Sequence, residues 1–115
     1  MQSMVDLYPS MNRVCVEVII NPHSIINQNT MNGIMTVIEQ VLFKAVSSQQ
    51  RGMNLFQFRG PFWNEKEELF TMMFHVNLFP GNNPFESIEK LIDLLVKKLE
   101  FKLKFSFDRI IQVSK

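Results

Sequence analysis

The amino-acid sequence predicts a single α+β domain, because its hydrophobic period switches between two and roughly 3.6 residues along the chain. Short segments alternate apolar and polar residues, as half-buried strands do, and two longer segments carry apolar residues at helical spacing. The length of 115 residues suits one domain. Folding a chain of that size buries about two thirds of the surface that it exposes when unfolded, which is enough for a real core.

Composition and charge exclude several classes of protein. Hydrophobic residues make up 46% and charged residues 20%, unlike a disordered chain, a collagen or a coiled-coil rod. The net charge of +1 gives no strong field to recruit nucleic acid or a membrane. Cys15 is the only cysteine, which excludes an intrachain disulfide. With no secretory signal pattern and no apolar run near the roughly 18 residues of a membrane span, the cytoplasm is the expected location.

The first half of the chain predicts a strand and then a helix. Residues 1–12 show no period and are expected to be irregular, whereas residues 13–20 alternate as a strand that ends before Pro22. From about residue 30 the apolar residues follow one face of a helix. They are Ile34, Val37, Ile38, Val41, Leu42 and Ala45. We expect Asn29 or Thr30 as the N-cap and Gly52 as the stop.

The middle of the chain predicts a β-hairpin. Residues 53–59 form a short strand that Gly60 and Pro61 break. A loop then runs to residue 68. Residues 69–79 alternate more regularly than any other segment and form the third strand.

The last third predicts a second helix and a fourth strand. Asn83 and Glu86 make a capping box around Pro84 at the first helical position. The apolar face of this helix comprises Ile88, Leu91, Ile92, Leu95 and Leu99. Residues 101–107 then alternate with a period of two, and a bulge or strand end is expected near residues 108–109.

The predicted order is β-α-β-β-α-β, which resembles the ferredoxin-like fold in topology. Two right-handed crossovers with a hairpin between them imply a four-stranded antiparallel sheet in the order 4-1-3-2, with two helices on one face. This topology hosts many unrelated functions, so the resemblance implies no activity.

Residue parity assigns the two faces of the sheet. The helix-covered face takes Val14, Val16, Val18, Ile20, Phe56, Phe58, Phe70, Met72, Phe74, Val76, Leu78, Phe101, Leu103, Phe105 and Phe107. The open face takes Arg13, Cys15, Glu17, Ile19, Leu55, Gln57, Arg59, Thr71, Met73, His75, Asn77, Lys102, Lys104 and Ser106. Because four of these are basic and only Glu17 is acidic, a two-fold contact through this face would oppose like charges, which favours a monomer over a homodimer.

Several chemistries lack the residues that they need. An RNA-recognition motif stacks bases on aromatic residues of the central strands, and the predicted open face offers none there apart from Phe79 at the end of the third strand. Phosphate-binding glycine loops are absent, and the loop after the first strand has no arginine to cradle an anion. Cys15, His23 and His75 are too scattered to predict a metal site, and His75 with Glu17 is more simply a surface hydrogen bond than an acid–base pair. We therefore expect no enzyme activity, cofactor or metal.

The hairpin loop holds the strongest candidate for partner binding. Trp63 is the only tryptophan, and a loop tryptophan is a typical interface anchor, although it would equally serve to cap the core. Nearby carboxylates would steer a basic partner. The candidate binding residues are Phe62, Trp63, Glu65, Glu67 and Glu68, with Arg59 and His75 as a second choice.

The sequence thus favours a non-enzymatic protein-binding module. One concrete form is an immunity- or antitoxin-type protein that binds and neutralises a toxin domain. Two alternatives stay open: a small-ligand-binding or degenerate enzyme domain that uses the open sheet face, and an RNA-binding domain. A ligand site predicts polar groups converging around His75, whereas a binding module predicts a flat or protruding surface.

Overall fold

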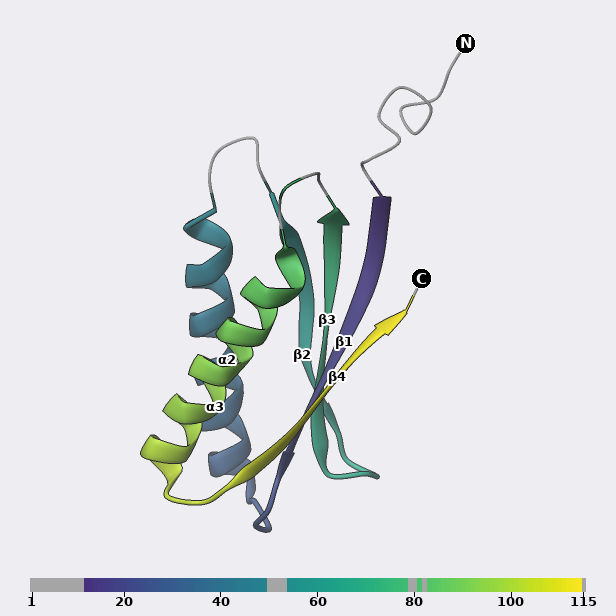
Figure 1. Ribbon diagram of the computed structural model, residues 1–115. Coiled ribbons are helices and arrows are strands. Elements are labelled where there is room, and N and C mark those ends of the chain that lie inside the picture. Colours follow the sequence, from purple (N-terminus) through teal and green to yellow (C-terminus); the bar gives the residue numbers. More distant parts are fainter. Residues whose placement is uncertain (1–11, 50–53, 79–80, 82, 115) are drawn as a thin grey trace.

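The computed structural model describes residues 12–49, 54–78, 81 and 83–114. The element order is β1 (Asn12–Pro22), α2 (Gln28–Ser47), β2 (Phe56–Asn64), β3 (Leu69–Leu78), α3 (Pro84–Leu103) and β4 (Phe107–Ser114). The strands form an antiparallel sheet in the order β2-β3-β1-β4, and both helices lie on the same side of it (Figure 1). The predicted ferredoxin-like topology is confirmed. None of the described helices combines the length and the hydropathy of a membrane span.

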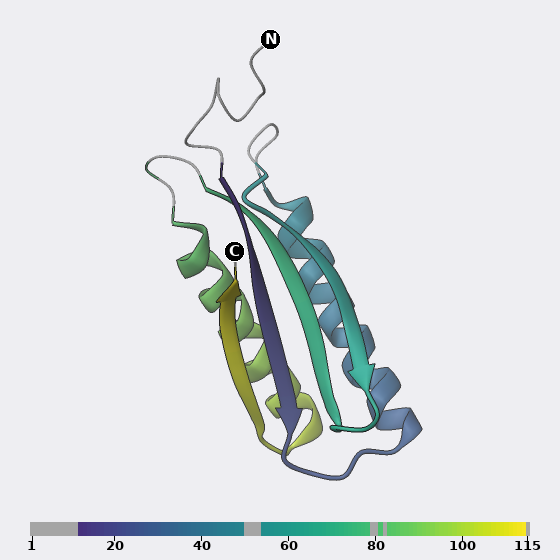
Figure 2. The ribbon, with the colours of Figure 1, turned by 90° about the vertical axis from the view of Figure 1, so that its right-hand side faces the viewer.

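The core lies between the sheet and the two helices. Alternate residues of the central strands point into it, so that Val18, Ile20, Phe70 and Phe74 are inaccessible to solvent. The helices contribute the apolar stripes that the sequence predicts. Their fully or nearly buried members are Ile34, Val37, Ile38, Val41 and Leu42 of α2 and Ile88, Ile92, Leu95 and Leu99 of α3. Figure 2 shows the sheet from its other side, where neither helix covers it.

Helix α2 begins and ends earlier than predicted. Its N-cap is Asn27, whose side chain accepts a hydrogen bond from the backbone N–H of Thr30 at 2.8 Å. The helix stops at Ser47, so the prediction of a stop at Gly52, which lies outside the described residues, is wrong. The side chain of Gln49 accepts hydrogen bonds from the N–H groups of residues 55 and 56, which ties the end of α2 to the start of β2.

Helix α3 has the predicted start and an unexpected end. Asn83 caps it by accepting from the N–H of Glu86 at 3.2 Å, as predicted. The helix then continues through Leu103, and Lys104 closes it in the left-handed conformation with φ of 64°. The prediction of a strand over residues 101–107 is therefore wrong. Leu103 extends the helical row of Leu95 and Leu99, and no glycine or proline interrupts it.

The fourth strand consequently lies further along the chain. β4 spans Phe107–Ser114 and pairs with β1 along its whole length, so no bulge occurs at residues 108–109. The N–H of Phe107 donates to the carboxylate of Glu100 at 3.2 Å, which anchors the strand to the end of α3. Lys102 and Lys104 therefore belong to the helix end and not to the open sheet face, and Phe101 is 78% exposed.

Strand β2 runs through the predicted break at Gly60 and Pro61. The register against β3 shifts between Arg59 and Phe62, and Gly60 adopts a φ of 108° that other residues rarely tolerate. A proline is accommodated because β2 is an edge strand, where the missing N–H removes no central hydrogen bond. The predicted loop thereby contracts to a turn over residues 65–68.

Candidate functional site

A row of three apolar residues and one threonine crosses the open face of the sheet from one edge to the other. The register places Phe62 of β2 opposite Thr71 of β3, and Thr71 opposite Ile19 of β1, which in turn faces Ile110 of β4. Phe62 is 51% exposed and Ile110 is 49% exposed, and the two central members are half-buried. We call these four residues the apolar belt. It follows one cross-strand row, so it is held by the hydrogen-bonded ladder of the sheet.

Among the described residues, opposite formal charges occur in equal number on the open face. Arg59 lies in the next row, in which Met73 separates it from Glu17. At the ends of the face, Arg13 donates a hydrogen bond to the side chain of Asn77, and Asp108 pairs with His23 at 2.7 Å. The predicted excess of positive charge on this face is therefore wrong, because Lys102 and Lys104 lie elsewhere. Leu55, also assigned to this face, precedes β2 and packs against the core.

The turn between β2 and β3 adds carboxylates beside one end of the belt. Glu65, Glu67 and Glu68 are exposed in this turn, which we call the acidic turn. The side chain of Asn64 accepts from the N–H of Glu67 at 3.0 Å and so stabilises the turn. Phe62 lies two residues before Asn64, at the same hairpin end. The three glutamates also line hollows with Trp63 beside the start of α2, so the acidic turn adjoins Trp63 as well as Phe62.

Trp63 is not on this surface. The sequence places it in a loop with Phe62, but the structure places both in β2, where neighbouring residues point to opposite faces. Trp63 is half-buried on the helical side, and its ring centroid lies 4.7 Å from that of Phe70. It packs against the core, which matches the alternative interpretation of Trp63 as a core cap.

The second-choice residues do lie on the open face. Arg59 is exposed, and His75 is half-buried opposite Gln57 on one side and Cys15 on the other. Glu17 stands opposite Met73 and not opposite His75, so the two are diagonal neighbours and the expected direct pair is not formed. Across the part of the chain that the structure describes, no three potential metal-ligating side chains gather in one place.

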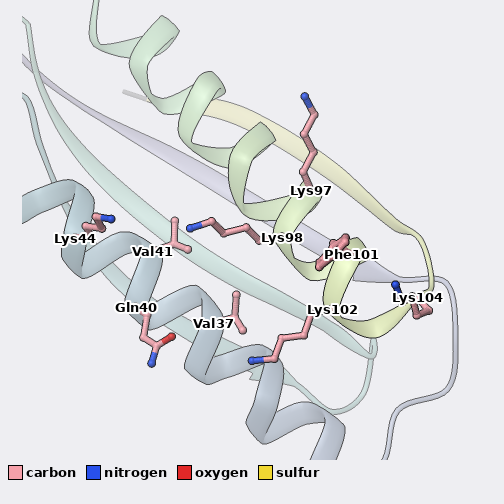
Figure 3. Close-up of a pocket in the computed structure, with 9 residues that line it drawn as sticks. All are labelled: Val37, Gln40, Val41, Lys44, Lys97, Lys98, Phe101, Lys102 and Lys104. Atoms are coloured by element: carbon pink, nitrogen blue, oxygen red, sulfur yellow. The ribbon is translucent and has the colours of Figure 1, made fainter.

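A groove between the helices was missed by sequence reasoning. It holds a volume of about 840 Å³ and is rich in lysine (Figure 3). Its lining residues are Val37, Gln40, Val41, Lys44, Lys97, Lys98, Phe101, Lys102 and Lys104, and we call it the lysine groove. The available signal was the helical spacing of Lys97, Lys98 and Phe101, which the alternating pattern of residues 101–107 obscured.

Comparisons with known proteins add little to this geometry. No family model matches the chain, and no curated protein matches it. A solved structure described as a dimeric ferredoxin-like protein from an uncultured marine organism is similar, with a TM-score of 0.47 and 15% identity over 90% of each chain.

Proposed function

We propose that this chain is a non-catalytic protein-binding module that docks onto another protein through the open sheet face at its hairpin end. The observation that carries the proposal is the apolar belt. A single exposed apolar side chain is ordinary, but three apolar residues and a threonine in one row across four strands, beside charged residues, are typical of an interface. Regular strands also hold such a row in place without the entropy cost of ordering a loop.

The charges around the belt indicate the chemistry of the partner. Phe62 would supply the main apolar contact, and the acidic turn would attract a basic rim on the partner and raise the association rate. An immunity- or antitoxin-type protein is one form of this proposal, in which the chain covers the basic surface of a toxin domain. We place that encounter in the cytoplasm, since a chain with the single cysteine Cys15 gains nothing from an oxidising compartment.

A small-ligand site on the same face receives less support. Such a site would require a hollow in which polar groups converge around His75. His75 lines none of the four hollows that lie between the helices, around Trp63 and along the side of α3. His75 lies between Gln57 and Cys15 in a regular cross-strand row, and such a row forms a flat surface.

The test measures how tightly two variants of this chain bind a partner that has been captured from a lysate of the source cells and then purified. Each variant replaces one exposed phenylalanine. Phe62→Ser should weaken binding about tenfold, since an interface concentrates its free energy in a few residues. Phe43→Ser is the matched control, because Phe43 is 71% exposed on α2, away from the open face. Unchanged affinity for Phe62→Ser, or equal losses for both variants, would reject the open face as the binding surface.

A further inference from the structure

The lysine groove lies on the opposite side of the sheet from the apolar belt, between α2 and α3 (Figure 3). It is therefore independent of the proposed protein-binding face. Along α2 it extends from Val37 to Lys44, which is about 10 Å of helix at 1.5 Å per residue. Its volume of about 840 Å³ falls within the range of small-molecule sites, which is roughly 300–1,000 Å³.

The charge of the groove is all of one sign. Five of its nine lining residues are lysines and none is acidic. The ion pairs among the described residues join His23 with Asp108, Lys90 with Glu86, and Arg109 with Asp93, so none neutralises a groove lysine. The five lysines do not all point into the hollow, because Lys97 extends away from α2 (Figure 3) and the ammonium group of Lys104 lies 4.7 Å from the centroid of the Phe101 ring. The like charges of the other lysines repel one another, and an anion bound among them would relieve that repulsion.

The rest of the lining is apolar. Val37 and Val41 are each 8% exposed and form the floor on α2, whereas Phe101 projects from α3 with 78% of its surface accessible. Figure 3 shows Lys98 and Lys102 extending from α3 toward α2. Their hydrocarbon stems lengthen the apolar surface while their ammonium groups reach its edge.

We propose that the lysine groove binds a small anionic amphiphile, meaning an acyl or aryl body of about 10 Å that carries a carboxylate or a phosphate group. Charge complementarity selects the anionic head, and the valine floor with Phe101 selects an apolar body. A bare anion would leave those apolar contacts unused. A partner helix would need apolar anchors repeated over several turns, whereas the groove offers Val37, Val41 and Phe101 only.

Calorimetric titration with probes of one chain length tests this proposal. Decyl phosphate and decanoate, both kept below their micelle concentrations, should both bind, and the ratio of their affinities distinguishes the two head groups. Decyl maltoside, which has the same chain and no charge, and inorganic phosphate, which has the charge and no chain, should each bind at least about tenfold more weakly. If inorganic phosphate or decyl maltoside binds as tightly as decyl phosphate and decanoate, the proposal is overturned.

Matched variants locate the binding in the groove. Lys98→Gln/Lys102→Gln should weaken decyl phosphate binding about tenfold through loss of charge-assisted contacts. Lys66→Gln/Lys90→Gln removes the same net charge from exposed lysines outside the groove and should bind as the natural chain does. Phe101→Ser should also weaken binding, and the melting temperature of each variant verifies its fold.

Three results would refute the groove as this site. The first is binding of decyl phosphate that is weakened equally in the control pair, and the second is binding that is as strong in both groove variants as in the natural chain. The third is binding of an acidic amphipathic peptide when neither anionic amphiphile binds, which would assign the groove to a protein segment. Loss of partner affinity in Phe62→Ser bears only on the open face, so the two proposals fail separately.

Discussion

The two faces of the sheet are built from the same strands but differ in burial and composition. On the covered face, alternate residues of β1 and β3 are aliphatic or aromatic and inaccessible, so Phe74 is surrounded by other core side chains. On the open face, the intervening residues combine charge with an apolar belt that stays partly accessible. The difference teaches that residue parity assigns a face, whereas the elements that pack against that face decide how strongly each residue contributes to stability.

The neighbours Phe62 and Trp63 show this contrast at a single step along β2. Trp63 contacts Phe70 on the covered side, and Phe62 lies in the belt on the open side. Similar side chains separated by one residue should therefore affect different properties. Substitution of Trp63 should change the free energy of unfolding, and substitution of Phe62 should change the affinity for the partner.

The largest expected effect is at the centre of the covered face. Phe74→Ala should lower the free energy of unfolding by about 3–5 kcal/mol, because it leaves a cavity beside Phe56, whose ring lies 5.5 Å away. Phe101→Ala is the control, since its side chain is exposed and the change should stay within about 0.5 kcal/mol. Urea denaturation measures both, and similar losses for the two variants would contradict this assignment of the core.

A smaller effect is expected at the edge of the same face. Trp63→Ala should cost roughly 2 kcal/mol, less than a fully buried aromatic residue, since the side chain is half-buried. Partner affinity of the folded fraction should not change. If affinity falls while the melting temperature is retained, Trp63 is a binding residue and the division between the faces is wrong there.

The fold was predictable because the spacing of apolar residues along the chain indicates which side of each strand or helix is buried. The alternation of residues 69–79 and the capping box at Asn83 identified β3 and the start of α3, and the topology followed from the order of elements. What the pattern did not resolve was residues 101–107, where alternation and helical spacing coincide. Leu103 belongs to both patterns, and contact with the core decided in favour of the helix.

The candidate site was less predictable, for a related reason. Gly60 and Pro61 normally end a strand, yet an edge strand tolerates them, and the resulting bulge moved Trp63 away from the predicted surface. The lysine groove depends on two helices that are distant in sequence. Neither helix alone indicates that Lys44 and Lys98 line one hollow.

The start of α3 provides the third test, since this helix closes the covered face. Asn83→Ala should cost about 1 kcal/mol by removing the side chain that accepts from the N–H of Glu86. Asn83→Asp retains an acceptor and should cost much less. Thermal denaturation of the two variants separates the cap from any other role of this position, and equal melting temperatures would contradict the capping role.

The smallest expected effect on stability concerns the open face. Phe62→Ala should change the free energy of unfolding by no more than about 0.5 kcal/mol, because the side chain is 51% exposed and lies outside the buried core. Removing an exposed aromatic ring from the belt should even favour solubility, since contiguous apolar surface promotes association. Partner affinity should nevertheless fall, in contrast to Trp63→Ala one residue away. If the covered face provides stability and the open face provides binding, urea denaturation should show the larger loss for Trp63→Ala, and calorimetric titration should show the larger loss of affinity for Phe62→Ala. A loss of stability for Phe62→Ala as large as that for Trp63→Ala would show that the belt supports the fold and leave the open face without a distinct role.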